Sequence, residues 1–330
     1  MNKPYNWGIV GPGKIAHKFA QDLLKLPKAK LHAVASRSME RAQAFAQQYG
    51  AQHAYDDYSQ LVNCPDLDVV YIATPHTGHF HHALLFLKNG IPVLCEKPLA
   101  VNNRQVQRMI YTAQKNQTFL MEAIWTRFLP THLKMWEIIN SGKIGKVLSV
   151  KADFGFKADF NPDGRLFNPA LAGGSLLDIG IYPVFLAMNV LGKPDDIQAI
   201  GHLGPTGVDE EVGILFKYKD GATAHLHSTI RANTKTEAFI YGEKGAIYLH
   251  TRWHEPSTMS LMLHGENPEM FRFNYNTNGY SYEATEVMRC LSLGMTESDQ
   301  LPLQFSADLM DVLFSVRHLI GLSYPSDEEE

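Results

Sequence analysis

A glycine turn between an apolar strand pattern and a helix pattern limits what this chain can fold into. The stretch reads Trp7-Gly8-Ile9-Val10-Gly11-Pro12-Gly13-Lys14-Ile15-Ala16. Gly11 allows a sharp turn, Gly13 leaves room for a phosphate group, and Ala16 lets the following helix pack closely on the strand. The first amide groups of that helix, expected from about Lys14 to Leu26, would face the anion. We therefore predict a dinucleotide site whose contacts are Gly11, Pro12, Gly13, Lys14, Ile15 and Ala16.

Strand and helix patterns alternate through the first third of the chain, which predicts a parallel sheet covered on both faces. The expected strands are 5–10, 29–35, 52–55, 68–73, 92–95 and 119–122. In the second half, strands joined by tight turns predict a mostly antiparallel sheet. These strands are expected at 146–156, 198–202, 212–218, 222–228, 236–241 and 246–250. The predicted fold is an α/β Rossmann domain over 1–123, a doubly wound parallel sheet, followed by an α+β domain over 124–330 with a large antiparallel sheet.

Composition excludes several classes of protein. With 330 residues, 45% of them hydrophobic, the chain can bury two cores. A net charge of -4 without a basic stripe argues against a nucleic-acid partner. Three cysteines without a CxxC pattern suggest a reducing compartment, and we expect a cytoplasmic protein. We expect neither a signal peptide nor an apolar run of membrane-spanning length.

The segment after the second strand predicts the choice of cofactor. An acidic residue about 20 residues beyond the glycines would bind the ribose of NAD, but this chain has Ser36 and Arg37 there, with Arg41 one helical turn later. A hydroxyl and guanidinium groups suit a 2′-phosphate. The sequence therefore favours NADP over NAD. The alternative is that both arginines are ordinary surface residues.

Four histidines follow the fourth strand, in the run Thr74-Pro75-His76-Thr77-Gly78-His79-Phe80-His81-His82. They invite a metal interpretation, but no cysteine or carboxylate lies nearby to complete a tetrahedral set. We predict no metal ion. Instead, Thr74, Pro75 and His76 are expected to pass under the nicotinamide ribose, with His79 close by.

The fifth strand ends in Glu96-Lys97-Pro98, a charged pair at the ligand-binding edge of the predicted sheet. Its position alone leaves two interpretations open, a cofactor contact or a surface ion pair at a strand end.

Taken together, the glycine turn, the loop from Ala73 to His79 and the Glu96-Lys97-Pro98 segment resemble the Gfo/Idh/MocA family of NAD(P)-dependent oxidoreductases. The segment Ala172-Gly173-Gly174-Ser175-Leu176-Leu177-Asp178-Ile179-Gly180-Ile181-Tyr182 resembles that family's second signature. Within the family, the pattern is most similar to dimeric dihydrodiol dehydrogenases and NADP-dependent sugar dehydrogenases. The resemblance implies a conserved lysine at Lys97, a proton donor at or near Tyr182, and a homo-oligomer, dimer or tetramer, joined through the open face of the second sheet.

The chemistry of these residue types fits hydride transfer at a CH–OH group, which needs an acid or base for the hydroxyl proton. A tyrosine has a free pKa of about 10, and a nearby ammonium group lowers that pKa. This gives Lys97 a reason to lie opposite Tyr182. Ser175 is expected to cap a helix that runs to about Leu191. Asp178 is one helical turn before Tyr182 and is expected on the same helix face, where it can hold the lysine or the substrate.

Candidate substrate contacts are aromatic or cationic residues expected around a cavity between the two domains. They are Trp125, Arg127, Phe154, Arg165 and Tyr280. The segment Arg165-Leu166-Phe167 departs from the Trp-Arg pair that many sugar-oxidising relatives carry, which puts transfer of their sugar preference in doubt. The expected substrate is a sugar, a cyclic polyol or a trans-dihydrodiol. The alternatives are a non-catalytic sugar sensor that binds NAD(P), and an imine or enone reductase.

Overall fold

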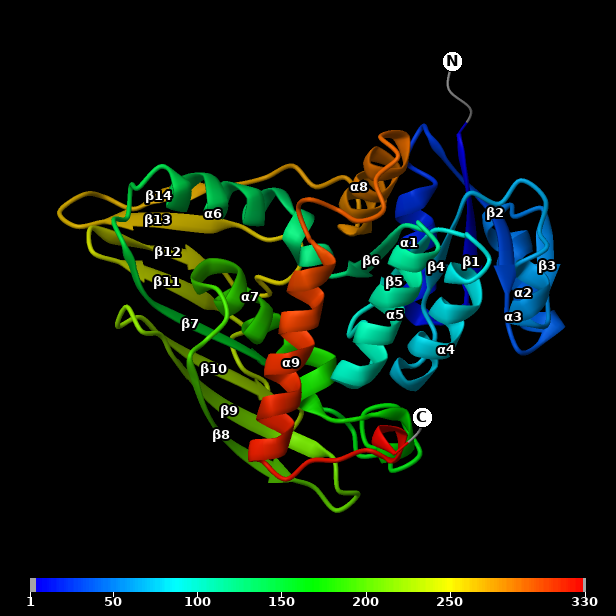
Figure 1. The fold of residues 1–330 in the computed structure, drawn as a ribbon. Coiled ribbons are helices and arrows are strands. Elements are labelled where there is room, and N and C mark those ends of the chain that lie inside the picture. The colour runs from blue at the N-terminus through cyan, green and yellow to red at the C-terminus, as the bar shows by residue number, and fades with distance from the viewer. Residues whose placement is uncertain (1–3, 329–330) are drawn as a thin grey trace. The chain divides into compact units, whose positions relative to one another are not determined.

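A computed structural model describes residues 4–328 of the chain (Figure 1). It contains two compact units. One unit comprises the chain up to Phe128 together with Tyr275–Ala307, and the other comprises Leu129–Asn274 together with the chain from Asp308 on. The segment Tyr275–Ala307 thus lies in the first unit, whereas a single division after residue 123 assigns it to the second domain.

The first unit is built on a six-stranded parallel sheet with the order β3-β2-β1-β4-β5-β6. In this doubly wound order, β2 and β3 follow β1 toward one edge of the sheet, and β4, β5 and β6 follow toward the other edge. The strands are β1 (Tyr5–Val10), β2 (Ala29–Ala35), β3 (His53–Tyr55), β4 (Val69–Ile72), β5 (Val93–Glu96) and β6 (Leu120–Ala123). The helices are α1 (Lys14–Leu23), α2 (Met39–Tyr49), α3 (Tyr58–Leu61), α4 (His76–Leu87), α5 (Asn103–Lys115) and α8 (Tyr280–Ser292). The predicted Rossmann domain is confirmed.

Helix α1 ends at Leu23, earlier than the predicted Leu26. The next amides bond in tighter turns, from Lys25 to the Asp22 carbonyl and from Leu26 to the Leu23 carbonyl, and Pro27 then has no amide hydrogen to offer. The chain therefore leaves the helix before the apolar pattern ends.

Helix α8 packs against α1, and one buried carboxylate of α1 binds the start of α8. Asp22 is fully buried and accepts hydrogen bonds from the backbone amides of Asn278 and Tyr280, both at 2.8 Å, and of Ser281 at 3.4 Å. The carboxylate satisfies amides at the start of α8, which would otherwise be buried without partners. This long-range cap carries no sequence signal.

The second unit contains an eight-stranded sheet with the order β14-β13-β12-β11-β7-β10-β9-β8, in which only the β7–β10 pair is parallel. The strands are β7 (Val147–Gly155), β8 (Asp196–Leu203), β9 (Asp209–Lys217), β10 (Thr223–Thr229), β11 (Ala238–Gly242), β12 (Gly245–Leu249), β13 (Met259–Leu263) and β14 (Glu269–Phe271). Helix α7 (Ile181–Leu191) packs on β7 and β10. The predicted antiparallel sheet is confirmed, and β13 and β14 extend it at one edge.

The remaining described elements connect these layers. They are α6 (Pro130–Asn140), α9 (Leu303–Leu319) and the short η1 (Trp125–Phe128), η2 (Pro169–Leu171), η3 (Leu176–Gly180) and η4 (Pro325–Asp327).

The stretch Pro169–Leu191 corrects one expectation, because its 23 residues are long and apolar enough to cross a membrane. It is 94% buried inside the protein over its most apolar part. A buried apolar helix is typical of a protein core, and α7 covers the second sheet in this way.

Candidate active site

The glycine turn after β1 leaves the start of α1 open. Gly11 has φ +88°, and a Cβ atom there would lie 2.8 Å from Cγ2 of Thr74. At Gly13 a Cβ would meet only the Ala73 carbonyl oxygen, at 4.0 Å. No side chain caps α1 within the described residues, and its first turn has no acidic residue. The first amides of α1 are therefore available to an anion.

A basic rim lies beside this turn. Arg37 is exposed directly after β2, and Ser36 is buried with its amide bonded to the Tyr55 carbonyl at 3.0 Å. The Nη2 atom of Arg41, on α2, donates to the Pro12 carbonyl at 3.5 Å. The two cations also act to lower the pKa of Tyr58, but burial outweighs them and raises it. Positive charge therefore gathers where a 2′-phosphate would be expected.

His82 joins the same rim, although the sequence did not mark it as a contact. Its Nδ1 atom lies 3.0 Å from Oγ1 of Thr74, and its ring stands edge-on to Tyr58 with the centroids 4.5 Å apart. Burial lowers the pKa of His82 to about 4, with nearby cationic groups including Arg37 adding to the effect. The ring is therefore neutral at neutral pH and adds no repulsion to the basic rim.

His79 joins two of the predicted cofactor loops from the inside. It is fully buried, and its Nε2 and Nδ1 atoms each lie 2.8 Å from a backbone carbonyl oxygen, of Thr74 and Pro98 respectively. Burial lowers its pKa, while these two contacts favour the protonated ring. Pro75 is exposed at the start of α4, and His76 is buried with its ring 5.8 Å from that of His79.

The segment that carries Lys97 is held by buried acidic groups. The Lys97 amide donates to Glu96 Oε2 at 3.2 Å, and the hydroxyl of the fully buried Tyr71 donates to Glu96 Oε1. The amide of Leu99 donates to Glu122 Oε1 at 2.8 Å. Burial raises the pKa of Glu122 to about 7, although the Lys97 ammonium acts in the opposite direction. The backbone on both sides of Lys97 is therefore fixed.

In the second unit, Tyr182 and Asp178 lie on the segment that precedes and opens α7. Asp178 forms a two-point ion pair with Arg165, at 2.7 and 3.2 Å. The Tyr182 ring is buried, with centroids 5.7 Å from Phe154 and 5.1 Å from His254. The turn Leu176–Gly180 is a π-helix rather than the predicted α-helix, and such turns occur often at functional sites.

The predicted cap of this segment is corrected. Ser175 does not cap the helix with its side chain, because its hydroxyl donates to Asp209 Oδ2 at 2.9 Å. The same carboxylate oxygen accepts from the Leu176 amide at 2.6 Å. Gly174 has φ +112°, and a Cβ atom there would lie 2.0 Å from Asp209 Oδ1. The glycine signature therefore admits a buried carboxylate beneath the turn that carries Asp178.

Burial raises the pKa of Asp209 to about 7. The folded protein therefore holds this proton between pH 3.8 and about 7 while the unfolded chain does not, so the contribution is complete at low pH and lost as the pH rises. We expect the free energy of unfolding of the wild type, relative to Asp209→Asn, to fall by up to about 1.4 kcal/mol per pH unit in this range. Urea unfolding between pH 4.5 and 7.5 measures it, and a difference constant with pH would contradict the prediction.

Trp125, Tyr280 and Arg127 lie together in the first unit. The rings of Trp125 and Tyr280 stack with centroids 4.4 Å apart, and both residues are buried. The Nε atom of Arg127 donates to the Gln300 carbonyl at 2.9 Å, while its Nη1 atom is buried without a hydrogen-bond partner in the described part of the chain. The guanidinium therefore keeps donor capacity.

Comparison with known proteins decides the family. A model described as "Oxidoreductase family, NAD-binding Rossmann fold" matches residues 5–124, and one described as "GFO/IDH/MocA C-terminal domain" matches residues 132–248. The chain belongs to the Gfo/Idh/MocA family. It is 38% identical over 335 residues to trans-1,2-dihydrobenzene-1,2-diol dehydrogenase of Danio rerio, covering 98% of this chain and 99% of the relative. The Homo sapiens protein of the same name is 37% identical, with 98% of both chains covered.

Solved structures share the fold. The aldose-aldose oxidoreductase of Caulobacter crescentus, in complex with glycerol, superposes with a TM-score of 0.87 at 23% identity, covering 96% of this chain and 97% of the other. KijD10, a 3-ketoreductase of Actinomadura kijaniata in complex with NADP, gives 0.83 at 23% identity, with 96% and 98% covered. This member of the Gfo/Idh/MocA family is an NAD(P)-dependent oxidoreductase.

Sequence reasoning missed several residues that contact the predicted cofactor loops or the segment that carries Asp178 and Tyr182. They are Tyr71, His82, Glu122, Asp209 and His254. Glu122 had a signal, because a carboxylate within the apolar run Phe119-Leu120-Met121-Glu122-Ala123 must have a buried partner. Asp209 and His254 come from distant segments, and no local pattern marks them.

Proposed function

We propose that the chain is an NADP-dependent dehydrogenase that acts on a CH–OH group of a trans-dihydrodiol, a cyclic polyol or a sugar. The observation that carries this proposal is the identity of 37–38%, over nearly the whole chain, with proteins named trans-1,2-dihydrobenzene-1,2-diol dehydrogenase. Oxidation moves a hydride from the carbinol carbon to the nicotinamide and a proton from the hydroxyl to a base, leaving a carbonyl. Reduction is the reverse.

Tyr182 is the proposed proton donor and acceptor, and Lys97 its proposed assistant. A phenol close to an ammonium group loses its proton more easily, since the cation favours the phenolate. The fixed backbone around Lys97 supports a positioned ammonium group. The ion pair of Asp178 with Arg165 supports a role for the carboxylate in orientation.

The proposed substrate contacts supply an apolar wall and cationic donors. Phe154 stacks on His254 with centroids 4.0 Å apart, beside the Tyr182 ring. Such aromatic surfaces suit the face of a carbocycle or a sugar ring. The Trp125–Tyr280 stack and the free donor of Arg127 are the corresponding features of the first unit.

NADP is the proposed cofactor because Arg37 and Arg41 flank the position where NAD-specific proteins place a carboxylate. We expect Arg37→Asp to lower the ratio of kcat/KM for NADP to that for NAD by about 10–150-fold, from lost charge-assisted bonds of about 1.5–3 kcal/mol. Initial rates with each cofactor measure this ratio. Arg272→Asp, an exposed arginine of the second unit, is the control. An unchanged ratio in Arg37→Asp would refute the assignment.

The open face of the eight-stranded sheet is the proposed surface for homo-oligomer formation. Ile200 of β8 is 84% exposed and Leu215 of β9 is 47% exposed, and both border a depression of about 500 Å³. Burying apolar area of this kind stabilises association. We expect Ile200→Glu to shift the wild-type oligomer toward monomer in sedimentation experiments, with the fold retained. A wild-type chain that is already monomeric would contradict the proposal.

The activity is tested by absorbance of the reduced nicotinamide. The purified chain is mixed with NADP and, separately, with trans-dihydrodiols, cyclic polyols and aldoses. Reduction of NADP by at least one of these classes supports the proposal. Binding of NADP without turnover of any of them would refute it.

A further inference from the structure

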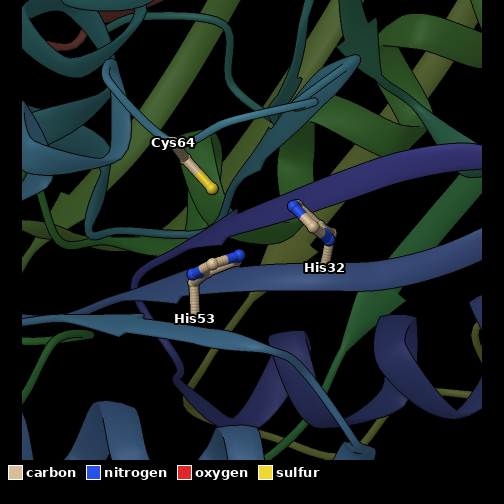
Figure 2. A group of neighbouring side chains, drawn as sticks. All are labelled: His32, His53 and Cys64. Atoms are coloured by element: carbon tan, nitrogen blue, oxygen red, sulfur yellow. The ribbon is translucent and has the colours of Figure 1, made fainter.

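Three side chains of the types that commonly ligate metals lie close together at one edge of the first unit's sheet (Figure 2). His32 comes from β2, His53 is the first residue of β3, and Cys64 lies in the loop between α3 and β4. One ligand atom of each lies within 4.8 Å of the others. None of the three belongs to the proposed cofactor or substrate contacts.

A bulge in β2 explains why His32 reaches this place. The register pairs Trp7 with Leu31 and Gly8 with Ala33, so His32 is an extra residue without a partner in β1. Bulges redirect side chains from the regular alternation of a strand. His53 is opposite Ala33 in the next strand, and the two imidazole rings are 4.8 Å apart between centroids.

The loop that carries Cys64 is fixed to the sheet. The backbone amide of Asn6, on β1, donates to Asp68 Oδ2 at 2.7 Å, and its side-chain amide donates to the Asp66 carbonyl at 2.8 Å. Cys64 itself is buried, with 6% of its surface exposed. The thiol is therefore held at the cluster by a loop with two anchors.

His32 and Cys64 share one backbone partner at the cluster. His32 is 5% exposed, and its Nε2 atom, the outer ring nitrogen that faces Cys64 in Figure 2, lies 2.9 Å from the Pro65 carbonyl oxygen. The Cys64 thiol donates to the same carbonyl oxygen at 3.7 Å. The Nδ1 atom of His32 is buried and has no hydrogen-bond partner among the described residues. An ion bound to Nε2 and Sγ would take the place of the Pro65 carbonyl, and the imidazole would then carry its proton on Nδ1.

We propose that His32, His53 and Cys64 bind one Zn²⁺ ion, with a water molecule as the fourth ligand. Two imidazoles and a thiolate suit zinc and exclude the oxygen-seeking Mg²⁺ and Ca²⁺. On binding, the Cys64 thiol releases its proton to solvent. Ligand atoms around zinc lie about 3.3–3.8 Å apart, so the cluster has to close by at most about 1.5 Å. His53 is half-buried and leaves a path for the ion and the water.

The bound ion would act as a structural link. Strand β3 has three residues and lies at the sheet edge, where it is paired to β2 alone. An ion shared with Cys64 ties this strand and β2 to the loop after α3. Because the folded chain brings the ligands together and the unfolded chain does not, binding stabilises the folded state.

The probe is Co²⁺, which adopts zinc-like sites and absorbs visibly when bound to thiolate. We expect the full chain, stripped with chelator, to bind one equivalent with a thiolate-to-cobalt charge-transfer band, and Zn²⁺ to displace it. Cys64→Ser removes the band. His53→Gln weakens Co²⁺ binding at least about tenfold. Zn²⁺ raises the Tm of the wild type but not that of His53→Gln.

Controls separate this site from other histidines and thiols. Cys290→Ser removes a buried thiol of α8, and His250→Gln removes a histidine bonded to Thr258 and Ser260 in the second unit. Both are expected to bind Co²⁺ like the wild type. If Cys64→Ser fails to fold, His53→Gln decides. No saturable binding, or binding unaffected by His53→Gln, would overturn the proposal.

Discussion

Tyr182→Phe is expected to lower kcat by about 10²–10⁴-fold, the usual contribution of a positioned general acid or base. The change removes one oxygen and keeps the ring beside Phe154 and His254. The fold and the dissociation constant for NADP should therefore remain as in the wild type. Single-turnover rates with a substrate found by the activity screen, together with NADPH fluorescence, measure both quantities. Tyr241→Phe, which changes an exposed tyrosine, is the control.

Lys97→Met is expected to lower kcat by a factor of the same order as Tyr182→Phe does. If the ammonium group acts by favouring the phenolate, the two side chains work as one unit, and their effects are not additive. The double variant should then be about as slow as the slower single variant. Multiplied losses in the double variant would mean independent roles. Near-normal turnover in either single variant would rule out the mechanism.

The pH profile gives a second measure of the same unit. In the wild type, kcat for oxidation should rise with pH as the tyrosine loses its proton. Without the Lys97 ammonium group, this rise should shift to higher pH. A profile that does not move in Lys97→Met would mean that the lysine acts by some other route.

The first unit was largely predictable because its signals are local. Strand and helix periodicity, a glycine turn and the residues after each strand are properties of short segments, and the parallel order follows from their alternation. Strand ends moved by one residue in several cases, since an apolar run does not mark where pairing stops. The predicted strand 92–95, for example, is observed as Val93–Glu96.

Long-range caps and register changes were not predictable. Asp22 bonds to amides more than 250 positions away, and Asp209 replaces the local cap expected at Ser175. In both cases a buried carboxylate satisfies amides that local side chains leave without partners. No local sequence pattern predicts the bulge at His32 either, although the bulge determines where that side chain points.

The polar groups beneath Lys97 belong to the same class. Tyr71 and Glu122 each read as members of apolar strands, and their function becomes visible only when β4, β5 and β6 lie side by side. A single sequence can mark a buried carboxylate as unusual, but its partner is found only in the folded chain.

Gly13→Ala is expected to weaken NADP binding by about 5–150-fold without a loss of stability. The new methyl group meets only the Ala73 carbonyl oxygen at 4.0 Å, and Gly13 has φ -91°, which alanine adopts easily. The folded protein therefore accepts the change. The added methyl group would, however, crowd the pyrophosphate, because the phosphate groups approach the backbone closely at this glycine. Crowding of this kind costs about 1–3 kcal/mol of binding free energy.

Gly11→Ala is the contrasting variant, since its methyl group would lie 2.8 Å from Thr74 Cγ2 at φ +88°. It should lower the Tm as well as NADP affinity. Gly90→Ala, at φ +69° with nothing within 4 Å, isolates the cost of the left-handed backbone alone. Thermal unfolding and NADPH fluorescence on the three variants separate backbone strain, steric clash and blocked ligand. Unchanged NADP affinity in Gly13→Ala would place the pyrophosphate elsewhere, because the start of α1 would then not be its binding site.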